Sequence, residues 1–296
     1  MGIAQQAYGA MRARVPRDWR GTLADAVERF GEVTGGSRML PSFLIVGGQR
    51  CGTNSLYAYL LGHPAVMRAL PHQEVHYFDL HHDRGLRWYR GHFPTMAWAR
   101  VTGARTGHPA ITGESSPYYM FHPLAPERIA ATLPGARLLV LLRDPVDRAY
   151  SQFHHERSRG NESLGFEEAL EHEADRLEGE EDRIRREPGY VSFSHQHHSY
   201  LSRGRYADQL ETVFAAIPRD HVAVVVSERL FAEPETVESE VLDFLGLPPA
   251  SDRPHGRHNA GRYDEMPPAL RRRLADHFAE PNHRLATMLG CDLPWS

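Results

Sequence analysis

Short, unbroken apolar runs punctuate the chain, and each is bounded by residues that break secondary structure. Three of them, at 42–46, 138–142 and 222–226, are almost wholly apolar, and a weaker run covers 110–113. Continuous apolar runs of this length are typical of strands that are buried on both faces of a parallel sheet. The pattern therefore predicts a sheet made largely of parallel strands.

Amphipathic segments follow these runs. The segment 55–61 places apolar residues at helical spacing, Pro145 suits the first turn of a second helix, and a third segment over 236–245 stops at Gly246. Strands that alternate with helices predict an α/β protein, here a P-loop-like three-layer fold with a central, mostly parallel sheet flanked by helices. In such folds ligands bind at the carboxyl ends of the strands.

The two ends of the chain differ from this middle part. Residues 1–40 are polar with a Gly-rich break at 34–36, which indicates a mobile or helical N-terminal extension and leaves 41–296 as a single domain. Near the other end, we expect one helix over 268–278 and a second, shorter helix over 282–289.

The composition limits the classes of protein to consider. The chain has 296 residues, of which 41% are hydrophobic and 24% charged, and no apolar run is long enough for a membrane span. The first residues lack the apolar core of a secretory signal, so we expect a cytoplasmic protein. The net charge of −4 argues against a nucleic-acid partner, since such binders usually carry a basic excess.

Two residue types change this picture. All 34 basic residues are arginine, so a phosphate or sulfate group would be bound by Arg, by backbone N–H or by neutral polar groups. The two cysteines, Cys51 and Cys291, cannot build a disulfide framework or a cysteine-based zinc site, and a single bridge between them is disfavoured. The histidine clusters near His81 and His195 lack partners at metal-ligand spacing, so we interpret them as solvated loop residues and predict no metal.

The first predicted strand leads into the loop GGQRCGTNS, residues 47–55. The gap between Gly47 and Gly52 matches a Walker A loop, but Thr53 and Asn54 stand where that motif requires Lys and Ser or Thr. Glycines let the backbone approach a ligand closely, and the start of a helix favours an anion. The loop therefore predicts an anion site, and a tight turn without a ligand is the alternative.

A second candidate site follows the strand at 138–142. Arg143 comes at the end of that strand, and Ser151 lies a little over two turns into the next helix. If Ser151 faces back toward the strand end, both side chains could contact one phosphate. The alternative is that Arg143 forms a surface ion pair with Asp144 or Asp147.

Five stretches in a fixed order carry a resemblance to a known family. They are GGQRCGTNSL, HQEVHYFD, GLRWYRGHFP, GESSPYY and LLRDPVDRAYSQF. Together they look like the sulfotransferases that use 3′-phosphoadenosine 5′-phosphosulfate (PAPS), in particular the bacterial and the heparan-sulfate or carbohydrate branch. The resemblance runs from about residue 41 to the end of the chain. It implies PAPS as co-substrate and a reaction that needs no metal.

The resemblance implies how the donor is held. The first loop of these enzymes grips the 5′-phosphosulfate, and the corresponding residues here are Gln49, Arg50, Cys51, Gly52, Thr53, Asn54 and Ser55. The family usually has lysine where Arg50 stands, and that lysine is thought to stabilise the leaving oxygen. Arginine supplies the charge with a different reach and without a proton to give. Arg143 and Ser151 match the family's 3′-phosphate site.

The resemblance also implies an acceptor side. Glu74 matches the base in the family pattern K-E-x-H-[FY]-F, and His76 would orient the acceptor or act as a second base. The alternatives are a surface carboxylate and a structural histidine. Ser115 replaces a common lysine of the substrate cleft, which makes that cleft less positive. Arg257 and Arg262 lie in the expected counterpart of a C-terminal loop that closes over the phosphosulfate.

These observations favour a sulfotransferase that acts on a hydroxyl, less favourably an amine, of a glycan, glycolipid or small-molecule acceptor. Aromatic residues either line the acceptor cleft or belong to the core: Trp88, Tyr89, Tyr118 and Tyr119. A P-loop nucleotide or small-molecule kinase is the rival enzyme, disfavoured because the chain has no lysine. A catalytically inactive nucleotide-binding protein is the third possibility. The oligomeric state is left open.

Overall fold

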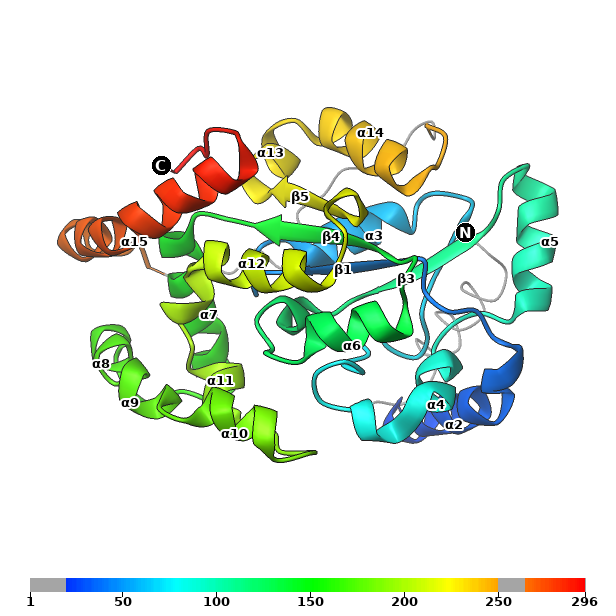
Figure 1. The fold of residues 1–296 in the computed structure, drawn as a ribbon, viewed down its shortest axis with the longest axis horizontal. Coiled ribbons are helices and arrows are strands. Elements are labelled where there is room, and N and C mark those ends of the chain that lie inside the picture. The colour runs from blue at the N-terminus through cyan, green and yellow to red at the C-terminus, as the bar shows by residue number, and fades with distance from the viewer. Residues whose placement is uncertain (1–19, 250–263, 296) are drawn as a thin grey trace.

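Five strands form one parallel sheet, which confirms the α/β architecture expected from the sequence. The computed structural model describes residues 20–249 and 264–295. The strand order is β2-β3-β1-β4-β5, and every neighbouring pair is parallel (Figure 1). The strands are β1 (Phe43–Gly47), β2 (Val66–Met67), β3 (Ile111–Ser115), β4 (Arg137–Leu142) and β5 (Val222–Val226). The apolar runs predict β1, β4 and β5 closely, whereas β2 is too short to show any periodicity.

Helices connect the strands and flank the sheet. They are α2 (Arg20–Thr34), α3 (Thr53–Leu60), α4 (Gly85–Gly91), α5 (Met96–Thr106), α6 (Ala125–Thr132), α7 (Pro145–Ser158), α8 (Phe166–Glu171), α9 (Glu173–Leu177), α10 (Glu180–Arg186), α11 (Phe193–His197), α12 (Tyr206–Ala216), α13 (Ser227–Ala232), α14 (Pro234–Leu245) and α15 (Pro268–Leu289). Short 3₁₀ turns lie at Gly35–Ser37, His82–Arg84, Pro117–Met120, Ser202–Gly204 and Arg219–His221.

The alternation of side chains along β1 divides the core into two layers. Phe43 and Ile45 face one side of the sheet and pack with α3, α13 and α14. Leu44 and Val46 face the other side and pack with α4, α6, α12 and the end of α15. All four side chains are buried, as expected of a strand covered on both faces. The sheet is therefore the middle layer of three (Figure 1).

The strand order fixes where a ligand can bind. From β1 the chain crosses to β2 and β3 on one side, and then returns to β4 and β5 on the other side. The order thus reverses at β1, and in open parallel sheets the crevice beyond the carboxyl end of such a strand is the usual ligand site. The loop after β1 and the start of α7 after β4 both lie at that edge.

The C-terminal segment is one helix, so the predicted break between two helices is wrong. α15 runs without interruption from Pro268 to Leu289 and contains Pro281. A proline inside a helix removes one backbone hydrogen bond and crowds the preceding turn. Here Pro281 is buried, and Phe278 and Leu285 are fully buried on either side of it. This packing holds the helix together across the proline.

The segment before β1 is helical and packs on the rest of the molecule. α2 lies against α4, where Gly31 and Gly91 are so close that a Cβ on either would overlap the backbone of the other. Trp88 Nε1 donates to Glu28 Oε1 at 2.6 Å across the same contact. Of the two alternatives for this segment, the helical one holds for 20–34; the division of the chain at residue 41 stays a prediction.

Candidate active site

Residues 47–55, from the last residue of β1 into the first turn of α3, are called the donor loop. Gly47 (φ 123°) and Gly52 (φ 87°) have positive φ, and so does Arg50 (φ 73°), which is uncommon for a residue with a side chain. A Cβ on Gly47 would overlap the carbonyl oxygen of Leu141 on β4. α3 begins inside the donor loop, at Thr53. The first backbone N–H groups of a helix have no hydrogen-bond acceptor within that helix. This geometry suits an anion held by backbone amides.

A cavity of about 760 Å³ opens over the donor loop. Its wall includes most of the residues predicted from the sequence: Gln49, Arg50, Gly52, Thr53, Asn54, Glu74, His76, Arg143 and Ser151. Cys51 and Ser55 are buried beneath the loop instead. Burial raises the pKa of the Cys51 thiol to about 11, so this side chain stays a neutral thiol. Arg257 and Arg262 lie outside the described residues.

The two predicted phosphate ligands come together with Arg50. Arg50 Nε donates to Ser151 Oγ at 3.1 Å, and Arg143 Nη1 donates to the Arg50 carbonyl oxygen at 3.3 Å. Ser151 therefore does face back toward the strand end, as the spacing requires. Arg143 Nη2 also lies 3.8 Å from Asp147 Oδ2, so the ion pair considered as the alternative is present as well. The three side chains form one polar cluster on the cavity wall.

The same cavity wall carries a second network, which no sequence pattern predicts. Gln49 Nε2 donates to Glu156 Oε1 at 2.9 Å, and Arg203 Nη1 donates to Gln49 Oε1 at 2.9 Å. Burial alone would raise the pKa of Glu156, but hydrogen bonds from His197, Asn161 and Gln49 outweigh it and lower this pKa to about 2. Glu156 therefore stays ionised and fixes the side chain of Gln49. These partners are far apart in the sequence, so no local motif could reveal them.

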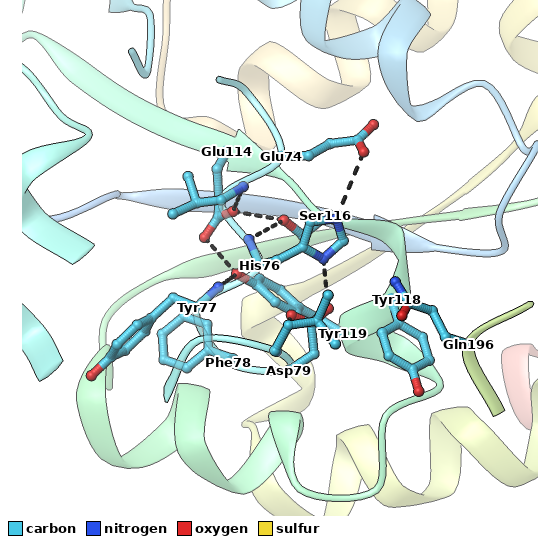
Figure 2. A network of polar contacts seen from close by, with 12 residues as sticks. Glu74, His76, Tyr77, Phe78, Asp79, Glu114, Ser116, Tyr118, Tyr119 and Gln196 are labelled. Atoms are coloured by element: carbon cyan, nitrogen blue, oxygen red, sulfur yellow. Dashed lines mark hydrogen bonds and ion pairs between the residues drawn. The ribbon is translucent and has the colours of Figure 1, made fainter. Parts of the chain in front are cut away.

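The predicted base, Glu74, lies on the wall of the same cavity as the donor loop. Glu74 Oε2 is 3.7 Å from His76 Nε2, and His76 Nδ1 is 2.8 Å from Asp79 Oδ2 (Figure 2). The exposed fraction of the side chain falls along this row from 42% for Glu74 to 22% for His76 and 0% for Asp79. The carboxylate that reaches the cavity is thus backed by a buried one.

The charge of His76 follows from these neighbours. Burial lowers the pKa of this imidazole, but the carboxylates of Asp79 and Glu74 outweigh burial and raise it to about 10. His76 is therefore a cation near neutral pH. A cation between two carboxylates orients Glu74 and cannot itself take a proton, which argues against His76 as a second base.

The aromatic candidates divide between cavity and core. Tyr118 lies on the cavity wall, whereas Trp88, Tyr89 and Tyr119 belong to the core on one face of the sheet. Tyr118 Oη is 2.7 Å from Nδ1 of His195, which is only 4% exposed. The expectation that His195 is a solvated loop residue is therefore wrong, because α11 carries it into the interior.

Ser115 also departs from its expected place. It is completely buried on β3, beside Ile45 of β1, and it is not part of the cavity wall. The position that the resemblance assigns to the substrate cleft is therefore filled here by a short side chain inside the sheet.

Metal and membrane binding can be assessed only for the part of the chain that the structure describes. Within 20–249 and 264–295, no three His, Cys, Asp or Glu side chains are grouped so that they could hold a metal ion. Over the same ranges, no helix is both long and apolar enough to span a bilayer.

The fold and the site define a P-loop-like α/β protein in which the donor loop, Arg143, Ser151 and Glu74 line one cavity. The chain belongs to the sulfotransferase family, since the model of the sulfotransferase domain matches residues 40–266. Heparan sulfate glucosamine 3-O-sulfotransferase 6 of Homo sapiens is 31% identical over 88% of this chain and 75% of its own length. Membrane-associated sulfotransferase kil1 of Dictyostelium discoideum is 24% identical over 86% of this chain and 66% of its own length.

A solved structure supports the same assignment. The crystal structure of a sulfotransferase from Alicyclobacillus acidocaldarius is 30% identical, with a TM-score of 0.62, and the match covers 87% of this chain and 99% of that one. The chain thus spans two thirds to three quarters of the two named relatives and nearly the whole of the solved structure.

Proposed function

We propose that this protein transfers a sulfuryl group from PAPS to a hydroxyl group of a glycan, with glycolipid and small-molecule acceptors as further candidates. The observation that carries the proposal is the single cavity, which brings together the donor loop, the Arg143–Ser151 pair and Glu74. The name of the human relative, which acts on heparan sulfate glucosamine, favours a glycan hydroxyl over an amine.

The residues of the cavity fit PAPS. Gly52 and Thr53, where α3 begins, lie on the cavity wall, and a 5′-phosphosulfate would approach the first backbone N–H groups of the helix there. Arg143 and Ser151 would hold the 3′-phosphate, Arg by a charge-assisted hydrogen bond and Ser by its hydroxyl. When bound, PAPS supplies the sulfuryl group and leaves as adenosine 3′,5′-bisphosphate.

Glu74 would act as the general base. Its carboxylate accepts the proton of the acceptor hydroxyl while that oxygen forms its bond to sulfur and the bond from sulfur to the bridging oxygen breaks. The backing by His76 and Asp79 would hold the Glu74 carboxylate in one orientation. Arg50 and the amides of the donor loop would stabilise the negative charge that develops on the leaving phosphate.

Two other functions are disfavoured by particular features. A kinase of the P-loop class needs a lysine at the position of Thr53, and the chain contains none. A catalytically inactive binding protein would not need Glu74, His76 and Asp79 in a row that leads to the cavity.

Calorimetry with three nucleotides tests the proposal. Adenosine 3′,5′-bisphosphate should bind more tightly than ADP or Mg-ATP, because only it carries a 3′-phosphate for Arg143 and Ser151. A preference for Mg-ATP would contradict the proposal. Transfer of labelled sulfate from PAPS to heparan sulfate, desulfated heparan sulfate and a panel of simple phenols would then identify the acceptor class; binding without any transfer would favour the inactive protein.

A further inference from the structure

The segment that carries Glu74, residues 73–77, has no strand or helix to fix it, yet it is firmly held. We call it the base segment. Its backbone belongs to neither regular structure over 73–76 and enters a turn at Tyr77. The backbone N–H groups of three consecutive residues donate to side chains instead of to a neighbouring strand: Val75 N to Glu114 Oε2 (3.0 Å), His76 N to Ser116 Oγ (3.2 Å) and Tyr77 N to Tyr119 Oη (2.7 Å).

All three accepting side chains come from one short stretch of chain. Glu114 lies on β3, and Ser116 and Tyr119 follow it directly, in and beside the 3₁₀ turn at Pro117–Met120 (Figure 2). β3 pairs with β1, the strand that leads into the donor loop, with Glu114 opposite Leu44. The base segment is therefore attached to the same sheet that positions the donor loop.

The direction of the hydrogen bonds to Glu114 follows from the single proton that each of the Ser116 and Tyr119 hydroxyls carries. The hydroxyls of Ser116 and Tyr119 each accept a backbone N–H, so each can use its own single proton elsewhere. Both protons point to Glu114, from Ser116 Oγ to Oε2 at 2.7 Å and from Tyr119 Oη to Oε1 at 3.0 Å. Tyr89 Oη adds a third hydroxyl donor to Oε1 at 2.6 Å.

Glu114 is therefore an acceptor for four donors, two on each oxygen. Only the ionised carboxylate can accept from all four, because a protonated acid must donate at one oxygen. The residue is completely buried on the face of the sheet that carries Leu44 and Val46, and burial raises its pKa. A buried charge is costly unless it is hydrogen-bonded, so the Glu114 carboxylate needs these four donors. The same hydrogen bonds hold the donor groups in one position.

A further contact ties the base segment to the donor side. Ser115 N donates to the Gln73 carbonyl oxygen at 2.9 Å, and Gln73 Nε2 donates to Asn54 Oδ1 at 2.6 Å. Asn54 is the second residue of α3, at the end of the donor loop. The start of the base segment is thus joined to the cradle, and its continuation is joined to Glu114, Ser116 and Tyr119.

We propose that Glu114, Ser116 and Tyr119 are positioning residues, which hold the base segment so that the Glu74 carboxylate keeps a fixed distance and direction from the donor loop. None of the three is part of the cavity wall, so they act through the backbone of the base segment. The proposal rests on the proposed role of Glu74 as base.

A pair of tyrosine variants tests it. Tyr119→Phe and Tyr89→Phe each remove one buried hydroxyl that donates to Glu114 Oε1, but only Tyr119 also accepts from the base segment. Tyr119→Phe should speed hydrogen exchange of the backbone amides in a peptide covering 74–78 by about tenfold, whereas Tyr89→Phe should leave it close to wild type. Ser116→Ala removes a smaller side-chain group, and we expect it to speed hydrogen exchange of the same peptide to a similar extent.

Activity gives the second measurement. Transfer of sulfate from PAPS to heparan sulfate should fall about tenfold in kcat for Tyr119→Phe and Ser116→Ala, because small displacements of a base reduce the rate strongly. The dissociation constant for adenosine 3′,5′-bisphosphate should stay within about twofold, since the donor loop is untouched. A purely structural role would instead lower thermal stability in both tyrosine variants alike and leave kcat equal in the two.

The outcomes are separable. Equal hydrogen exchange in Tyr119→Phe and Tyr89→Phe would overturn the proposal, and so would faster exchange without a loss of kcat. Wild-type protein that transfers no sulfate would contradict the proposed function. Hydrogen exchange needs no substrate, so it would still show in that case whether the three side chains hold the segment.

Discussion

The two sides of the cavity are built by different means. The donor loop is shaped by its own backbone: its glycines set the turn, and Gly48 N donates to the Leu141 carbonyl oxygen at 2.9 Å, which continues the pairing of β1 with β4. The base segment has one backbone hydrogen bond to β3, from Ser115 N to the Gln73 carbonyl oxygen, and is otherwise attached through side chains of 114–119. A backbone cradle either forms or fails as a unit, whereas side-chain attachments can be changed one hydrogen bond at a time.

The largest expected effect is the loss of sulfate transfer when Glu74, the proposed base, is replaced. Glu74→Gln keeps the shape of the side chain but cannot accept the proton, so sulfate transfer should fall by about 10²–10⁴-fold. Binding of adenosine 3′,5′-bisphosphate should stay within about twofold, because the donor side is unchanged. Steady-state kinetics and calorimetry measure the two effects, with Glu187→Gln, an exposed residue directly after α10, as control. Unchanged turnover would exclude Glu74 as the base.

On the donor side the opposite pattern is expected. Arg143→Ala should weaken binding of adenosine 3′,5′-bisphosphate by about 10–100-fold, which corresponds to one hydrogen bond from a charged group. Adenosine 5′-phosphate lacks the 3′-phosphate and should bind the variant and the wild type alike. An equal loss for both nucleotides in calorimetry would show that Arg143 does not recognise the 3′-phosphate.

Arg50→Lys introduces the residue that the family usually has at this position. The charge is kept, but the hydrogen bond from Arg50 Nε to Ser151 Oγ is lost. Because lysine keeps the charge and can still donate to an anion, kcat/KM for PAPS should fall by only about 2–10-fold. A rise in kcat/KM would instead indicate that arginine is the poorer residue in this loop.

The last prediction concerns the pH dependence of stability and not binding or turnover. The pKa of His76 is about 10 in the folded protein and about 6.5 in the unfolded chain. Its contribution to stability is therefore complete below about pH 6.5 and is lost as the pH rises toward 10. The melting temperature of the wild type, measured relative to that of His76→Gln, should therefore fall as the pH rises from about 6.5 to about 10. A constant difference between the two would contradict the ion pairing with Asp79 and Glu74.

Sequence patterns reveal the donor side well because its parts are local. The apolar runs locate β1 and β4, and the residues just after them, the donor loop and Arg143, must then lie at one edge of the sheet. The position of Ser151 follows from the helical repeat after Pro145. Strand and helix geometry bring these residues near one another, whereas their assignment to the 5′-phosphosulfate and the 3′-phosphate comes from the family resemblance.

The parts that sequence patterns did not reveal depend on tertiary packing. Gln49 and Glu156 meet only because α7 returns to the donor loop, and α15 stays continuous across Pro281 only because its face is buried. Glu114 is different, because the sequence does show a charged residue within the apolar surroundings of the buried strand Ile111–Ser115. A charge at such a position indicates a partner network.

The docking of α2 bears on how the chain can be shortened. α4 presents Trp88 to α2, through Glu28, and the neighbouring Tyr89 to Glu114. A protein trimmed to begin at residue 41 would expose the indole N–H of Trp88 and loosen the helix that delivers the Tyr89 hydroxyl. The bracing depends on α2, so a shortened chain that keeps it must retain Arg20–Thr34.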